Sequence, residues 1–221
     1  IFLELQDKCA NNINLVTATH FVPQVAEALV KAKNKGLVIP VVYNSSAYEN
    51  VSTLNMLDGL VDVYLPDMKY IDSRLSAEYS KAPDYADVAK AAIHEMVRQT
   101  RKPEFFIEDD ELVKSGRVEA GIMKKGVIVR HLVLPGTTKD SKAVIKYLID
   151  TYGDDIYISI MSQYTPFERL KKHPLLSRKV TRKEYNSVVD YAIDCGINNG
   201  FIQEGDVAEE SFIPEFDYEG I

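Results

Sequence analysis

The sequence has no tryptophan, only two cysteines and no long apolar run. A membrane-spanning helix needs about 20 predominantly apolar residues in a row, so we expect no membrane segment. Cys9 and Cys195 lie far apart in the chain, and we interpret both as free, buried thiols of a cytoplasmic protein. The first residues carry no signal-peptide pattern, which agrees with a cytoplasmic location.

An excess of positive charge is missing as well. The 26 lysines and arginines are outnumbered by 33 aspartates and glutamates, which gives a formal net charge of −7. A nucleic-acid-binding surface needs clustered basic residues, and no basic run occurs, so we expect no nucleic-acid partner. The 221 residues, 46% of them apolar, suffice for the core of one large α/β domain over residues 1–221.

The beginning of the chain has the pattern of the second half of a helix. Ile1, Phe2 and Leu5 follow helical spacing, but neither a capping residue nor an initiator methionine precedes them. We therefore expect a fragment that lacks at least one strand–helix unit upstream. Such a loss exposes a strand edge and an apolar patch, so we expect self-association through that edge.

Short apolar runs, rich in β-branched residues, alternate with segments of helical periodicity. We predict strands at residues 12–16, 37–43, 61–65, 127–134, 156–161 and 200–203. We predict helices near residues 23–35, 50–58, 72–80, 84–101, 140–152 and 181–196. Repeats of this kind form parallel sheets joined by right-handed crossovers. The sequence therefore predicts an α/β fold with parallel strands.

Two segments fall outside this alternation. Residues 102–121, which carry proline, glycine and Asp-Asp turn signals, are predicted to form an irregular excursion or a β-hairpin. The acidic and aromatic tail, residues 206–221, is predicted to lie as an extended strap over the body.

Polar residues follow the predicted strands at the points where these strands end. Ligands of barrels and open parallel sheets bind at the carboxyl ends of the strands, so these residues outline one candidate site. They are Thr17, Thr19, His20, Asn44, Ser46, Asp67, Lys69, Gln163 and Tyr164. Arg130 joins them from inside an apolar strand, because a buried guanidinium needs an anionic partner. The alternative for each is structural: helix capping, turn formation or an ion pair without a ligand.

Six short motifs occur in order along the chain. They are Asn-Ile-Asn-Leu-Val-Thr-Ala-Thr-His (12–20), Val-Val-Tyr-Asn-Ser-Ser-Ala-Tyr-Glu (41–49), Val-Asp-Val-Tyr-Leu-Pro-Asp-Met-Lys-Tyr (61–70), Gly-Val-Ile-Val-Arg-His-Leu-Val-Leu-Pro-Gly (126–136), Ile-Ser-Ile-Met-Ser-Gln-Tyr-Thr-Pro (158–166) and Gly-Phe-Ile-Gln-Glu-Gly (200–205). Together they resemble the radical S-adenosylmethionine proteins of the pyruvate formate-lyase activating enzyme family. The resemblance implies a partial (β/α)6 TIM-like barrel, truncated at its N-terminus.

The resemblance also implies cofactors and partners. Proteins of this family hold a [4Fe–4S] cluster through a Cys-x3-Cys-x2-Cys motif and take electrons from a donor. They cleave S-adenosylmethionine to methionine and a 5′-deoxyadenosyl radical, which abstracts hydrogen from a substrate such as a glycyl-radical protein. This chain has no such cysteine motif. We therefore expect no metal ligand here, cluster ligands upstream, and an inactive fragment.

The resemblance assigns the methionine end of S-adenosylmethionine to two loops. Thr17, Thr19 and His20 stand where the family meets the amino group, although its Gly-Gly-Glu motif is absent. Asp67 and Lys69 match its Asp-x-Lys motif, and a lysine there can reach the ligand carboxylate.

The remaining candidates are assigned to other parts of the ligand. Asn44 and Ser46 follow the second strand, where the family touches the ligand. Arg130 faces ligand or substrate. Gln163 and Tyr164 lie at the level of the adenosine, and Tyr164 would stack on the adenine.

Two other functions stay open. A TIM-barrel lyase unrelated to this family would use Lys69 as a base, which requires this lysine to be desolvated and free of Asp67. A non-catalytic interaction domain would instead use residues 102–121 and the acidic tail as its contact surfaces.

Overall fold

The structure is a computed structural model that describes residues 1–202. Its centre is a seven-stranded sheet, in which six parallel strands follow one another in chain order as β1-β2-β3-β5-β6-β7. The strands are β1 (Ile13–Val16), β2 (Val41–Ser45), β3 (Val63–Pro66), β4 (Glu104–Phe105), β5 (Met123–Leu132), β6 (Tyr157–Met161) and β7 (Gly200–Ile202). Among the described strands β1 and β7 do not pair, so the sheet stays open. The predicted α/β fold, a partial TIM-like barrel of parallel strands, is confirmed.

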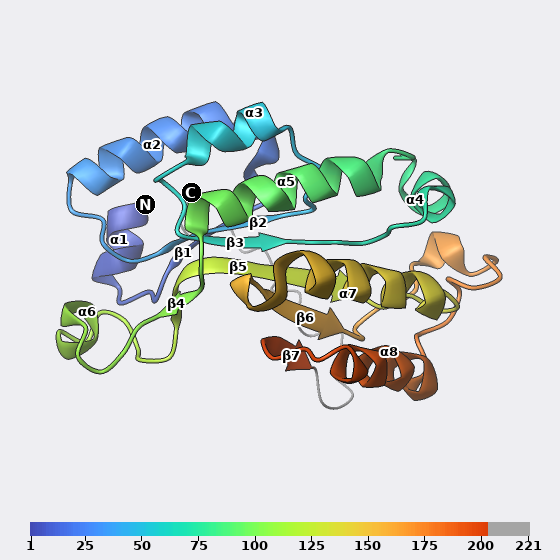
Figure 1. Ribbon diagram of the computed structural model, residues 1–221. Helices are drawn as coiled ribbons and strands as arrows, with labels where there is room; N and C mark the ends of the chain where they lie inside the picture. Colours follow the sequence, from blue (N-terminus) through green and yellow to red (C-terminus); the bar gives the residue numbers. More distant parts are fainter. Residues whose placement is uncertain (203–221) are drawn as a thin grey trace.

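One helix precedes the first strand, and the others lie in the connections between strands (Figure 1). They are α1 (Phe2–Asp7), α2 (Val22–Asn34), α3 (Val51–Leu54), α4 (Ser73–Ser80), α5 (Tyr85–Thr100), α6 (Glu111–Lys114), α7 (Thr138–Tyr152) and α8 (Arg182–Asp194). Short 3-10 turns are η1 (Ala18–Phe21), η2 (Asn55–Leu57), η3 (Gly153–Asp155) and η4 (Glu168–Leu170). No helix of the described part is both long and apolar enough to cross a membrane.

The main core lies between the helices and one face of the sheet. Tyr43 of β2 and Tyr64 of β3 are fully buried there, and their rings meet edge to face with centroids 6.0 Å apart. Leu29 of α2, Ile93 of α5 and Leu148 of α7 pack into the same cluster. Full burial of a large apolar side chain contributes roughly 1.5–3 kcal/mol. One face of every central strand is therefore buried against the helices.

Residues 102–121 form an excursion at the amino-terminal end of the sheet. It contains β4, which pairs antiparallel with the beginning of β5, and the short helix α6. Phe105 and Met123 pack with Val42 and Val63 on the face of the sheet opposite the main core. The excursion thus covers the face opposite the main core at the amino-terminal ends of the strands. The same face at the carboxyl ends of the strands is left free for other contacts.

Helix boundaries follow the local sequence at some points and depart from it at others. The helix predicted near 181–196 begins with a capping box, which Thr181 and Glu184 form at the start of α8. Asp140, at the start of the helix predicted over 140–152, lies inside the first turn of α7, because that helix begins at Thr138. The predicted helix near 50–58 is divided into α3 and η2. The strap predicted for residues 206–221 lies outside the described residues.

Candidate functional site

Successive side chains of a strand point to opposite faces of a sheet. This alternation places the core residues on one face and the candidate site residues on the other. We call the face opposite the main core the open face. In β2, Tyr43 packs in the main core and Asn44 lies on the open face. In β5, His131 is buried on the helix side at 1% exposure, whereas the preceding Arg130 lies on the open face. An isolated β-bridge then aligns Asp67 with Arg130.

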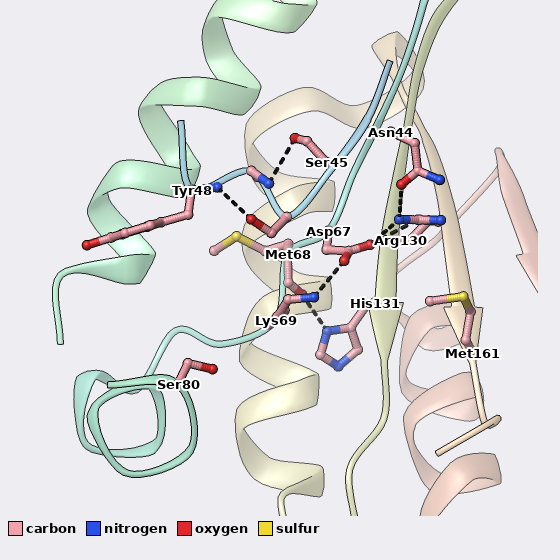
Figure 2. Close-up of polar contacts among 12 residues, drawn as sticks. Asn44, Ser45, Tyr48, Asp67, Met68, Lys69, Ser80, Arg130, His131 and Met161 are labelled. Atoms are coloured by element: carbon pink, nitrogen blue, oxygen red, sulfur yellow. Dashed lines mark hydrogen bonds and ion pairs between the residues drawn. The ribbon is translucent and has the colours of Figure 1, made fainter. Parts of the chain in front are cut away.

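Four polar side chains meet at the carboxyl ends of three neighbouring strands, and we call them the polar cluster (Figure 2). Arg130 donates from Nε and Nη2 to Asp67 Oδ1, at 2.9 and 2.7 Å. Its Nη2 also lies 2.6 Å from Asn44 Oδ1. Lys69 Nζ donates to the other carboxylate oxygen, Asp67 Oδ2, at 2.6 Å. Of the ten candidate residues, these four are brought into direct contact.

The polar cluster carries a surplus of positive charge. Two cations share one carboxylate, and both oxygens of Asp67 are occupied. The side chains of Arg130 and Lys69 are 25% and 38% exposed, so both cations are accessible from solvent. Within residues 1–202, Nη1 of Arg130 has no partner. A partly desolvated guanidinium with a free N–H edge, next to an ammonium, is suited to bind a carboxylate.

Tyr85, the first residue of α5, joins the two loops that carry the polar cluster. Its buried hydroxyl lies 2.9 Å from the carbonyl oxygen of Ser46 and 2.7 Å from that of Asp67, and these share its proton. The same oxygen accepts the backbone N–H of Lys69 at 3.1 Å. Burial raises the pKa of Tyr85, so the phenol stays protonated. The β2–α3 and β3–α4 loops are therefore fixed relative to each other.

Two further side chains hold the backbone around Lys69. His131 Nδ1 lies 2.7 Å from the carbonyl oxygen of Met68 and donates to it. Burial lowers the pKa of His131 to about 4, so the imidazole is neutral at pH 7. The carboxylate of Asp140 accepts the N–H groups of Ile71 and Asp72, the latter at 2.8 Å. Burial raises the pKa of Asp140.

The loop after β1 lies beside the polar cluster and is fastened to β2. Thr17 has a left-handed backbone with φ 55° and donates its N–H to the carbonyl oxygen of Asn44 at 3.0 Å. Thr19 is partly buried and donates its hydroxyl proton to Glu49 Oε1 at 2.7 Å. His20 is exposed. Over residues 1–202, no hydrogen bond joins any of these three candidate side chains to the polar cluster.

The candidates Ser46, Gln163 and Tyr164 are placed differently. Ser46 is exposed, and its hydroxyl oxygen accepts the N–H of Tyr48 in a turn. Gln163 is exposed just after β6, with its amide 3.7 Å from the sulfur of Met161. Tyr164 is 8% exposed and donates its hydroxyl to the carbonyl oxygen of Leu176 at 2.8 Å. In this conformation the Tyr164 ring packs inside the loop between β6 and α8, so stacking on a ligand would require that loop to move.

Three supporting residues were missed by the sequence-based interpretation. Tyr85 and Asp140 bind loops more than 15 positions away along the chain, and nothing in their local sequence indicates this. Glu49 is 3% exposed and binds Thr19 and Tyr43. Glu49 stands between Tyr48 and Asn50 in a largely polar stretch, so the local sequence gives no signal for its burial.

Residues that could hold a metal ion are not brought together in the described part. Over residues 1–202 there is no group of three or more histidine, cysteine, aspartate or glutamate side chains with suitable placement. Both cysteines are free thiols, but the prediction that they are buried is wrong for Cys9, which is exposed, and Cys195 is only partly buried. The polar cluster itself has one carboxylate and two cations, which is a poor ligand set for a cation.

Comparisons with known proteins agree with this fold. No family model matches the chain. The chain is 29% identical over 154 residues to the uncharacterized protein MJ0674 of Methanocaldococcus jannaschii, which covers 70% of this chain and 38% of that protein. A solved domain of a pyruvate-formate lyase-activating enzyme from Bacteroides vulgatus matches with a TM-score of 0.54. The fold is shared. That match covers 87% of this chain and 98% of the solved domain, at 11% identity.

The extent of these matches limits what they show. This chain spans little more than a third of the length of the curated relative, namely 38%. At 11% identity, the match to the solved domain concerns the fold alone. The activity therefore has to be argued from the site.

Proposed function

We propose that this chain is the ligand-binding core of a radical S-adenosylmethionine enzyme of the activating type. In this proposal the polar cluster binds the carboxylate of the methionine part, with Arg130 and Lys69 as the anion-binding groups and Asp67 and Asn44 holding them. The single observation that carries the proposal is the Asn44–Arg130–Asp67–Lys69 arrangement at the carboxyl ends of three strands. The fold shared with an activating-enzyme domain supports it.

The residues present fit S-adenosylmethionine but not an iron–sulfur cluster. A zwitterionic amino-acid head group needs an anion-binding pair and a nearby acceptor for its ammonium. The polar cluster offers the pair, and the loop of Thr17, Thr19 and His20 offers acceptors. Two isolated cysteines cannot supply three thiolates, so we place the ligands of the iron–sulfur cluster outside these 221 residues.

The role of the chain's own residues follows from this arrangement. Arg130, Lys69 and the neighbouring hydroxyls bind and orient the ligand, while the electron-transfer chemistry belongs to the cofactor. Tyr85 holds the β2–α3 and β3–α4 loops, which carry the polar cluster, at a fixed distance from each other. The site is therefore preorganised before the ligand binds. A cytoplasmic location, an electron donor and a glycyl-radical protein as hydrogen donor complete the proposal.

The two rival functions differ in what they require of the site. A lyase that uses Lys69 as a base needs this lysine desolvated and free of Asp67, but Lys69 is 38% exposed and lies 2.6 Å from Asp67 Oδ2. A non-catalytic interaction domain needs no anion site at all. The partly exposed polar cluster favours ligand binding over both alternatives.

Calorimetric titration of the 221-residue chain with S-adenosylmethionine tests the proposal. We expect saturable binding that Lys69→Met weakens at least about tenfold, because one charge-assisted hydrogen bond is lost. Lys35→Met is the matched control, since Lys35 is an exposed lysine at the end of α2, on the opposite edge of the sheet. Decarboxylated S-adenosylmethionine should bind the wild type as weakly as the full ligand binds Lys69→Met. Equal affinities for both ligands would contradict the proposal.

A further inference from the structure

A stretch rich in lysine and arginine follows β6 at the carboxyl end of the sheet. Seven of the 26 basic residues of the chain fall within residues 169–183, and this stretch has no aspartate or glutamate. Six of the seven form adjacent pairs, at residues 171–172, 178–179 and 182–183. Apolar and polar residues separate the pairs, so no continuous basic run marks the stretch in the sequence. We call residues 169–183 the basic segment.

The described part of the chain leaves some of this positive charge unbalanced. Ion pairs join Lys171 to Glu168 at 2.6 Å and Arg178 to Glu184 at 2.7 Å. Lys172 and Lys183 are exposed, and neither forms an ion pair within residues 1–202. Cations gathered in one segment repel each other unless an anion lies among them. The basic segment therefore favours a further acidic partner.

Large apolar side chains are exposed in the same loop between β6 and α8. Phe167 is 63% exposed and Leu175 is 36% exposed. Exposed apolar groups beside cations fit a partner that supplies both carboxylates and apolar or aromatic side chains. A partner with negative charge alone would leave these apolar groups in water.

The acidic tail, residues 206–221, has the complementary composition. It carries six aspartates and glutamates and no lysine or arginine. Phe212, Ile213, Phe216 and Tyr218 stand among these carboxylates. The tail thus offers both kinds of group that the surface of the basic segment favours.

The position of Ile202 brings the tail close to the basic segment. Ile202 pairs with Ile160 of the neighbouring strand β6, at a spacing of about 4.8 Å between strands. Tyr185 donates its hydroxyl to the carbonyl oxygen of the same Ile160 at 2.9 Å, and it lies in the first turn of α8, where the basic segment ends. Residues 203–205 separate Ile202 from the tail, and three residues span at most about 10 Å.

We infer that the acidic tail binds the basic segment of its own chain. A tethered segment reaches an effective concentration of about 1 mM, so a weak attraction is enough to keep the two together. The contact is sensitive to salt, because the Debye length falls from about 8 Å at physiological ionic strength to about 3 Å at 1 M. The inference does not depend on the proposed function, since it involves neither the polar cluster nor S-adenosylmethionine.

Carbodiimide cross-linking of the 221-residue chain tests this contact. The reagent joins an ammonium to a carboxylate when the two groups touch, and mass spectrometry locates the new amide bond. We expect bonds from Lys172 and Lys183 to the carboxylates of the tail, reduced at least about fivefold by 1 M NaCl. Lys146 and Asp150, 2.9 Å apart on α7, are the positive control. Lys35, exposed at the end of α2, is the negative control.

The pattern of cross-links decides the inference. Bonds between the tail and the basic segment that salt suppresses support it. A tail that forms no bond to the basic segment, or bonds to Lys35 as often as to Lys183, overturns it. An equal mixture of isotope-labelled and unlabelled chains shows which chain supplies the tail. Bonds that join labelled to unlabelled peptides would assign the contact to a second copy and overturn the inference.

Neutral substitutions give an independent measurement. One variant changes five carboxylates of the tail to the corresponding amides, namely Glu209→Gln, Glu210→Gln, Glu215→Gln, Asp217→Asn and Glu219→Gln. The matched control makes the same change of net charge at exposed carboxylates of α1, α2 and the excursion, namely Glu4→Gln, Asp7→Asn, Glu27→Gln, Glu108→Gln and Glu119→Gln. Immobilised heparin serves as a polyanion that competes with the tail for the basic segment.

We expect the tail variant to elute from heparin at an NaCl concentration about 0.1 M higher than its matched control, because the loss of the tail carboxylates frees the basic segment for the polyanion. Elution of both variants at the same salt concentration would overturn the inference, since net charge alone would then account for the retention.

Discussion

Arg130 and Asp67 form a two-point ion pair that joins two parallel strands beyond their last regular ladder contact. Both Nε and Nη2 of Arg130 approach the same carboxylate oxygen, at 2.9 and 2.7 Å. Lys69 occupies the second oxygen. The single carboxylate thus holds together two cations that would otherwise repel each other. This pair belongs at once to the fold and to the proposed anion site.

Asp67→Asn should destabilise the protein and disorder the polar cluster. The substitution leaves the partly buried Arg130 without its counter-charge, for an expected loss of about 1–2 kcal/mol in the free energy of unfolding. Urea denaturation measures the loss. Glu27→Gln is the control, because Glu27 forms an exposed ion pair with Lys31 on α2 and its loss should not be measurable. Equal effects of both substitutions would show that the Asp67 pair is only a surface contact.

Tyr85→Phe should loosen both loops of the site without damaging the core. It removes one hydroxyl that is hydrogen-bonded to the backbone of Ser46, Asp67 and Lys69. We expect a loss of about 1–2 kcal/mol in the free energy of unfolding. Hydrogen exchange should accelerate at the amide of Lys69. Tyr48→Phe controls for the loss of a tyrosine hydroxyl, since Tyr48 is exposed and, over residues 1–202, its hydroxyl bonds to Asp84 alone. An unchanged exchange rate at Lys69 would contradict the role assigned to Tyr85.

His131 should make the protein less stable in mild acid. Its pKa is lowered to about 4 in the folded state by burial, against 6.5 for an ordinary histidine. Between these values the unfolded chain binds a proton that the folded chain excludes, so stability falls as the pH drops from about 6.5 to 4. The shifted pKa of His131 accounts for a loss of about 3 kcal/mol in the free energy of unfolding over this pH range.

The His131 contribution can be isolated by substitution. The difference in the free energy of unfolding between pH 7 and pH 4.5 should shrink by roughly 2–3 kcal/mol in His131→Gln relative to wild type. His94→Gln, which replaces an exposed histidine of α5, should leave the difference unchanged. Parallel pH profiles for wild type and His131→Gln would mean that the buried imidazole does not titrate as described.

Gly136→Ala should destabilise the loop that precedes α7 more than Gly116→Ala destabilises its own turn. Both glycines have positive φ, +76° and +70°, so either alanine costs about 1 kcal/mol in backbone strain. A Cβ at Gly136 would also lie 2.8 Å from the side chain of Leu175, whereas one at Gly116 meets nothing within 4 Å. We expect about 1 kcal/mol more for Gly136→Ala in thermal unfolding. Equal losses would show that Leu175 moves aside freely.

The strands and the centre of the site could be predicted from the sequence for one shared reason. Parallel strands in chain order bring their carboxyl ends to one edge, so a polar residue after each strand is enough to predict that Asn44, Asp67 and Arg130 converge. The β-branched runs gave the strand positions, and the arginine inside one of them indicated an anionic partner. The nature of that partner, Asp67, follows from the register between β3 and β5.

The supporting residues could not be predicted because their contacts are distant in sequence. Tyr85 reaches Ser46 across 39 positions, and Asp140 reaches Ile71 across 69. No local pattern encodes such pairs; only the packing of α5 and α7 on the sheet creates them. Tyr164 shows that position after a strand does not settle where a side chain lies, since it follows β6 as expected but donates its hydroxyl to the carbonyl oxygen of Leu176 in its own loop.

The alternation along β5 ties the chemistry of the site to the integrity of the fold. Arg130 and His131 are neighbours in the chain, yet one lies on the open face and the other in the interior. A slip of one residue in this strand would exchange them and drive a guanidinium into the apolar layer. Insertions or deletions within β5 should therefore abolish folding. Length changes in the loops that follow β5 can instead alter ligand specificity without loss of the fold.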